Sequence, residues 1–133
     1  MHLSLPFFSA LIVTATAASI PYRRSPTSWT GWNLTTGCSP AGCTYNFNIA
    51  GAPSIDVPGF NTTCSGTDLQ APYKPCADSS VKTTVRSNGW PLFNITILHE
   101  YMDDHGVLTK AYGNQTNSPV GKIFTVPIYR LTE

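Results

Sequence analysis

The sequence predicts an all-β fold, a compact antiparallel β-barrel or sandwich stapled by two disulfides. Three observations support this prediction. Apolar and polar residues alternate in several separate segments, as they do in strands that are buried on one face. Charged residues make up only 11% of the 133 residues, whereas Thr, Asn, Ser, Gly and Pro recur and disfavour helices. Four cysteines lie close together, and a domain of this size gains from such cross-links.

Residues 1–19 are predicted to form a signal peptide. A short polar start precedes an apolar run that is too short to cross the roughly 30 Å hydrocarbon layer, and small residues at its end fit the small-x-small cleavage rule. Residues 20–24 are a candidate pro-segment, because Arg23 and Arg24 are either a dibasic processing site or a pair of surface arginines. Residues 25–133 then make a single secreted β-domain.

The charge of this domain excludes some partners. If processing removes Arg23 and Arg24, six of the eight Lys and Arg residues remain against seven Asp and Glu, a net charge of −1. Such a domain lacks the basic surface that binds nucleic acid. No second apolar segment indicates a membrane anchor. The predicted location is therefore extracellular, with no nucleic-acid or membrane partner.

The first strand of the domain is expected within residues 29–36. With regular alternation Trp29 shares the outer face with Asn33, whereas Trp32 and Leu34 share the other face. An exposed Trp29 would either cover a barrel end or serve as a binding-site aromatic.

The next strands show clear alternation. In residues 43–49 the odd positions are apolar and the even positions polar, so the odd side chains are expected to face the core. Residues 59–64 and 81–85 are two further strands, and they flank a polar, proline-containing loop that returns to Cys76.

Residues 93–112 are predicted to form a β-hairpin. Residues 93–101 alternate, and the following turn at 102–106 carries the Asp and Gly residues that a tight reversal needs. A final strand spans residues 123–131, where Pro127 marks an edge strand or a barrel-closing strand.

Four cysteines in a secreted chain predict two disulfides, for which three pairings are available. Loop length favours Cys64 with Cys76, a bridge worth about 3 kcal/mol in the loop-entropy model. Cys38 then pairs with Cys43 around a short turn that contains Pro and Gly. A metal site is the disfavoured alternative, because the spacings lack paired Cys-x-x-Cys motifs and thiols oxidise outside the cell.

Four Asn residues satisfy the N-glycosylation rule and are predicted to carry glycans at the surface. The alternation of residues 93–101 places its acceptor on the polar face, so the periodicity agrees with this prediction. The four sites are Asn33, Asn61, Asn94 and Asn114.

One cluster in the sequence has catalytic residue types. It comprises His99, Glu100, Asp103, Asp104 and His105. Two imidazoles and three carboxylates could bind a divalent metal or form an acid–base pair. However, His99 and Glu100 point to opposite faces of one strand, and the other residues belong to a solvated turn. Replacing both histidines is therefore expected to cost only about 0.5 kcal/mol, as at exposed sites.

Other catalytic motifs do not occur in the sequence. There is no Gly-x-Ser-x-Gly elbow and no Gly-rich phosphate loop. Asp56, Asp68 and Asp78 stand apart in loop-like segments rather than as a paired set of carboxylates. We therefore assign no catalytic residue, no metal site and no cofactor, and the sequence predicts a protein that is not an enzyme.

Several segments together carry a family resemblance. They are residues 45–49, the strand that ends at Cys64, Tyr73 shortly before Cys76, residues 78–81 and the hairpin 93–112. Over residues 29–112 this pattern resembles the Alternaria major allergen family of small secreted fungal proteins. The resemblance implies a compact antiparallel β-barrel in proteins described as allergens, plant-defence elicitors or effectors. It also implies a disulfide where Cys64 and Cys76 lie.

Two features of that family have no counterpart in this sequence. They are a second disulfide near the C-terminus and an N-terminal cysteine that links a dimer, so we expect a monomer or a weak non-covalent dimer. The expected function is that of a secreted fungal effector, elicitor or allergen-like protein that binds a host protein or wall glycan without catalysis. The alternative is a small secreted hydrolase or metal-dependent enzyme that uses residues 99–105.

Overall fold

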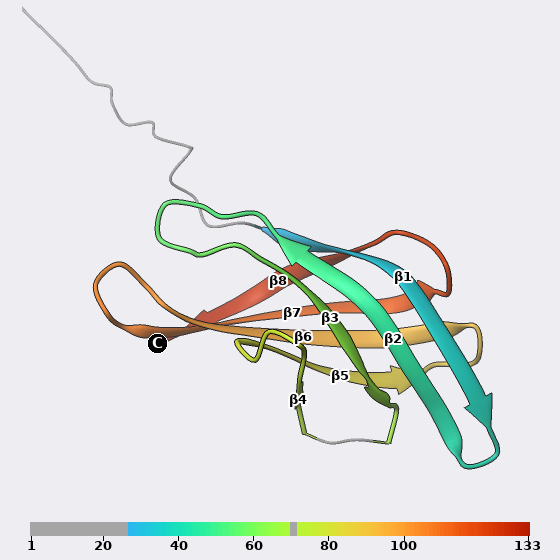
Figure 1. Cartoon of the computed structure of the whole chain (residues 1–133). Helices are drawn as coiled ribbons and strands as arrows, with labels where there is room; N and C mark the ends of the chain where they lie inside the picture. The colour runs from blue at the N-terminus through green and yellow to red at the C-terminus, as the bar shows by residue number, and fades with distance from the viewer. Residues whose placement is uncertain (1–26, 70–71) are drawn as a thin grey trace, which may run out of the picture.

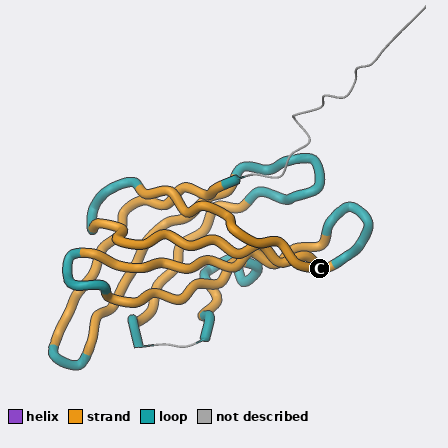
Figure 2. Tube along the Cα trace, turned by 180° about the vertical axis from the view of Figure 1, so that it is seen from behind, coloured by secondary structure: helices purple, strands orange, loops and turns teal. Residues whose placement is uncertain are grey.

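The computed structural model describes residues 27–69 and 72–133, which fold into strands joined by loops (Figures 1 and 2). The predicted signal peptide and pro-segment lie outside the described residues. Within the described part, no helix is long and apolar enough to cross a membrane. The strands are β1 (Ser28–Ser39), β2 (Gly42–Gly51), β3 (Phe60–Thr67), β4 (Lys74–Pro75), β5 (Val81–Ser87), β6 (Leu92–Met102), β7 (Leu108–Pro119) and β8 (Phe124–Thr132).

The strands form a nearly closed antiparallel barrel in the order β3-β2-β1-β8-β7-β6-β5-β4. Figure 1 shows β1, β2 and β3 crossing over the layer of β5 to β8. β8 belongs to both layers, because residues 124–127 pair with β1 and residues 128–132 pair with β7. Pro127 lies where the partner changes, so of the two predicted roles the edge strand is wrong, and β8 is an interior strand that joins the two layers of the barrel.

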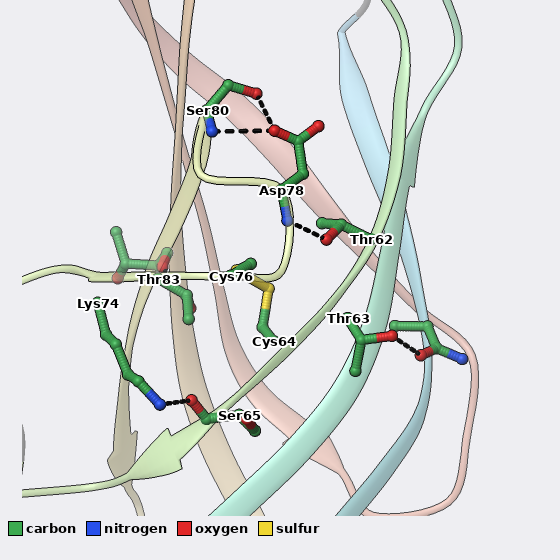
Figure 3. The surroundings of a disulfide bond; sticks show 11 residues. Thr62, Thr63, Cys64, Ser65, Lys74, Cys76, Asp78, Ser80 and Thr83 are labelled. Carbon is green, nitrogen blue, oxygen red and sulfur yellow. Dashed lines mark hydrogen bonds between the residues drawn. A yellow bond between two sulfur atoms is a disulfide. The ribbon is translucent and has the colours of Figure 1, made fainter.

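A seam separates β3 from β4 and β5, and specific contacts close it (Figure 3). The disulfide between Cys64 and Cys76 joins β3 to the segment that follows β4. Ala77 N donates to the carbonyl of Thr63 at 2.9 Å. The other seam bonds run from Asp78 N to Thr62 Oγ1 (2.8 Å) and from Lys74 Nζ to Ser65 O (2.7 Å). Contacts of side chains and loop backbone thus connect β3 to the β4–β5 segment, where no strand ladder joins them.

Both predicted disulfides are present. Cys38 and Cys43 face each other across the β1–β2 hairpin with their Cα atoms 3.9 Å apart, and Cys64 and Cys76 lie 4.4 Å apart. None of the cysteines is free. The pairing derived from loop length is confirmed.

The core fills the space between the two layers. As predicted, the odd residues of 45–49 and of 93–101 face inward, and Cys43 is half-buried at the edge of the core. Burial of this apolar surface is the main stabilising term of the fold. The central members are Trp29, Leu34, Tyr45, Phe47, Ile49, Phe60, Val81, Val85, Phe93, Ile95, Ile97, Phe124 and Val126.

The predicted outward position of Trp29 is wrong, because its side chain is only 2% exposed. The register of β1 shifts between Trp32 and Thr35, where Asn33 adopts a φ of 58°. Such a bulge adds one residue to the strand and reverses which positions face inward. Trp29 before the bulge and Leu34 after it therefore both reach the core.

Candidate functional site

The fold disperses the cluster of catalytic residue types. His99 faces the core, whereas Glu100 lies on the outer face of β6 and forms an ion pair with Lys82. The hydrogen bond from Lys82 is the main cause of the lowered pKa of Glu100. Residues 103–105 lie in the turn between β6 and β7. The prediction that His99 and Glu100 face opposite sides is confirmed, and the five residues do not converge.

The turn itself is built as a hairpin requires. The carboxylate of Asp103 accepts from the backbone N–H groups of Val107 (2.9 Å) and His105 (2.8 Å), and the former bond contributes most to its lowered pKa. Gly106 adopts a φ of +78°, which favours glycine.

Within the described ranges, residues 103–105 are the group whose potential metal-ligand atoms lie within 4.8 Å of one another. His105 Nδ1 lies 3.0 Å from Asp104 Oδ1, but these side chains are 80% and 54% exposed. The third carboxylate, that of Asp103, is already engaged by backbone N–H groups. Exposed acidic groups of this kind are common without an ion, so the geometry assigns no metal site.

His99 is enclosed by aromatic rings. Its ring centroid lies 4.6 Å from that of Phe60, 5.0 Å from Tyr101 and 6.4 Å from Trp29. Burial lowers the pKa of His99, and the charge of Asp78 opposes this effect. Its Nδ1 has no hydrogen-bond partner among the described residues. The residue also lines a cavity of about 10 Å³, the size of one water molecule. The expectation that His99 behaves as an exposed residue is wrong.

The strand register brings a second group of side chains together, on the outer face of β5 to β8. The pairing aligns one outward side chain from each strand, in the order Lys82, Leu98, Tyr112, Arg130. A bulge in β8 lies opposite Tyr112, because Arg130 pairs with Tyr112 whereas Ile128 pairs with Gly113. The extra residue turns Tyr129 outward beside Arg130.

These side chains form one aromatic patch. The ring centroids of Tyr112 and Tyr129 are 6.4 Å apart, and the guanidinium carbon of Arg130 lies 4.1 Å from the centre of the Tyr112 ring. Tyr73, from the segment before β4, lies close enough to these three side chains for their charges to influence its pKa. Burial raises its pKa, as do Tyr129 and Tyr112, while Arg130 lowers it. We call Tyr73, Tyr112, Tyr129 and Arg130 the tyrosine face.

The tyrosine face is suited to binding. Tyr129 is 59% exposed, and Leu98, which pairs with Tyr112 on the same outer face, is only 7% exposed. Tyrosine and arginine supply large contact areas and hydrogen bonds at protein interfaces. Sugar rings pack their C–H faces on aromatic rings, and a guanidinium donates to their hydroxyl groups. The arrangement can therefore hold a saccharide without any catalytic group.

Sequence reasoning did not find this surface. The alternation of β7 identifies Tyr112 as an outward residue, but the bulge that exposes Tyr129 together with Arg130 depends on pairing between strands. Tyr73 lies 39 positions before Tyr112 and reaches it only through the fold. In the sequence, part of the face could have been indicated by the dipeptide Tyr129-Arg130, which interrupts an otherwise alternating strand.

The four sequons all lie at the surface. Asn33, Asn61 and Asn114 are exposed and Asn94 is half-buried. Asn94 and Asn114 stand on the same outer side of the sheet as the tyrosine face, because their positions follow the alternation of β6 and β7. Glycosylation at these residues stays a prediction.

Comparison with models of protein families found no match. Searches of curated proteins and of solved structures likewise found no significantly similar protein.

Proposed function

We propose that this protein is a secreted, non-catalytic binding protein that recognises a cell-wall polysaccharide through its tyrosine face. The observation that carries the proposal is the pair of neighbouring rings on the outer face, an exposed Tyr129 and a half-buried Tyr112, with the exposed Arg130 stacked on Tyr112. A rigid sheet supports these side chains, which limits the entropy lost when a ligand binds.

The resemblance to the Alternaria major allergen family supports the same class of function. From this resemblance we propose the role and the compartment of the protein, namely a fungal effector, elicitor or allergen-like protein that acts outside the cell. The small disulfide-stapled barrel agrees with an oxidising compartment. The alternative to a polysaccharide ligand is a host protein that binds the tyrosine face.

The enzyme alternative receives less support from the geometry. His99 is buried among aromatic rings, and Glu100 is paired with lysine. The remaining three residues lie in the β6–β7 turn, where Asp104 and His105 are exposed. An acid–base or metal mechanism needs these groups around one reacting atom.

A sedimentation assay with insoluble chitin, β-glucan and cellulose tests the proposal. We expect the protein to bind at least one of them, and Tyr112→Ala or Tyr129→Ala to weaken binding by about tenfold or more, as for central aromatic contacts. Trp90→Ala is the matched control, because Trp90 is also highly exposed (66%) but lies in the β5–β6 turn.

Two results would contradict the proposal. One is equal binding by the tyrosine variants and the unaltered protein, which would place the site elsewhere. The other is binding to no polysaccharide together with capture of a plant apoplast protein that depends on Tyr112 and Tyr129, which would establish the host-protein alternative.

A further inference from the structure

One of the four sequons lies directly beside the tyrosine face. In β7 the residues Tyr112, Asn114 and Thr116 lie on the outer side, while Ala111 and Gly113 on either side of Tyr112 are buried. Alternate residues on one face of a strand are about 7 Å apart. A sugar attached to Asn114 is therefore within reach of the Tyr112 ring.

The contacts of Asn114 are compatible with modification. Its side chain is exposed, and Thr96 Oγ1 donates to its Oδ1 at 3.4 Å. This bond uses the oxygen, whereas an N-linked glycan is attached through Nδ2. The hydrogen bond thus orients the amide without occupying the atom that is modified.

Asn114 differs from the other three sequons in its sequence context. It has an aromatic residue two positions earlier, whereas Asn33, Asn61 and Asn94 have Gly, Gly and Leu at the equivalent positions. The alternation of a strand makes that aromatic residue the same-face neighbour of the modified Asn. Asn114 is therefore the one sequon of the four with an aromatic residue two positions earlier on the same face, where the ring can stack on the first sugar.

We propose that the glycan on Asn114 lies on the tyrosine face and competes there with external polysaccharide, an inference that rests on the proposed function. The first sugar packs against Tyr112. Arg130 now lies 4.1 Å from that ring, but its side chain is exposed, and an exposed cation–π contact is weak enough to be displaced. The displaced guanidinium then donates to hydroxyl groups of the glycan.

Tethering gives the chain's own glycan an advantage over a free saccharide. A group held by a short linker acts at an effective concentration on the order of millimolar. Removal of the Asn114 glycan, or its trimming, would then open the tyrosine face and strengthen binding. The glycan regulates the site rather than merely covering the surface.

Stability measurements test the contact without any polysaccharide. The protein is produced in a eukaryotic secretory host as four forms: unaltered, Tyr112→Leu, Thr116→Ala, and both changes together. Thr116→Ala removes the sequon but keeps the Asn114 side chain. We expect Tyr112→Leu to lower Tm by about 2–5 °C more in the glycosylated background than in the Thr116→Ala background. Asn61→Gln, which removes a sequon on β3, is the control and should combine additively with Tyr112→Leu.

Binding measurements test the competition. Thr116→Ala should bind the polysaccharide that the sedimentation assay identifies several-fold more tightly than the unaltered protein, whereas Asn61→Gln should not. Additive Tm changes in the Tyr112 and Thr116 pair, or an Asn114 that peptide mapping finds unmodified, would overturn the inference even if polysaccharide binds. If no form binds polysaccharide while the Tm changes are coupled, the proposed function fails but the contact between glycan and Tyr112 stands.

Discussion

His99 couples the folded state to pH. In the unfolded chain an imidazole has a pKa of about 6.5, and burial among aromatic rings lowers the pKa of His99 in the folded protein. Below about pH 6.5 the unfolded chain therefore binds a proton that the folded chain binds less readily. It follows that His99 makes the free energy of unfolding decrease as the pH falls.

We predict that His99→Leu reduces this acid sensitivity. Leu has a similar volume, does not titrate and leaves no unpaired Nδ1 in the core. Urea unfolding at about pH 7.5 and about pH 5 measures the effect: the loss of stability between the two should be smaller in His99→Leu than in the unaltered protein. His105→Ala, at an 80% exposed side chain, should leave the difference unchanged. An unaltered pH dependence in His99→Leu would contradict the prediction.

The turn between β6 and β7 shows how a local sequence determines an element. Gly106 adopts a φ of +78°, and a Cβ atom added there would meet no heavy atom within 4 Å. Any cost of a larger residue therefore comes from the backbone conformation and not from a clash. A β-branched residue resists positive φ most strongly.

We predict that Gly106→Val destabilises the protein by about 1–2 kcal/mol. His105→Ala, one position earlier in the same turn, should change the free energy of unfolding by at most about 0.5 kcal/mol. Chemical denaturation of both variants makes the comparison. If Gly106→Val left the stability unchanged while His105→Ala reduced it, the imidazole would have a role that the turn geometry does not explain.

The regular strands could be predicted from alternation, and the bulges could not. The odd positions of residues 43–49 and 93–101 face the core as their periodicity indicates, because the extra residues of the neighbouring bulges lie in the partner strands β1 and β7. With β3 and β5 these segments pair without a register shift. In β1 one residue with positive φ, Asn33, reverses the parity and carries Trp29 inside. Asn tolerates that conformation, but Asn33 is also a sequon residue, so its identity alone did not indicate a bulge.

What could be predicted of the candidate site also depended on whether a feature follows from sequence distance or from pairing between strands. Cysteine spacing indicated both disulfides because loop length is a property of sequence distance. The tyrosine face needs a bulge in β8 and a residue from the segment before β4, which only the three-dimensional pairing brings together. Burial of His99 likewise follows from the position of Trp29 and Phe60 on other strands.

The closure of the barrel depends on one disulfide more than on the other. Cys64–Cys76 spans 12 positions and crosses the seam between β3 and β5, whereas Cys38–Cys43 spans five positions within a hairpin that its own strand ladder already holds. The loop-entropy model assigns about 3 kcal/mol to the first and about 2 kcal/mol to the second. Loss of the first also leaves the seam to a few hydrogen bonds, such as that from Ala77 N to Thr63 O.

We therefore predict that Cys64→Ala with Cys76→Ala destabilises the protein more than Cys38→Ala with Cys43→Ala, by about 1 kcal/mol or more. Urea unfolding of both double variants measures the difference, and native-state hydrogen exchange locates it. The amide of Ala77 should lose protection in the first variant because the seam opens locally, while amides in the centre of β6 and β7 stay protected. A larger loss of stability in the Cys38 and Cys43 variant would show that the hairpin, and not the seam, is the weak point of the barrel.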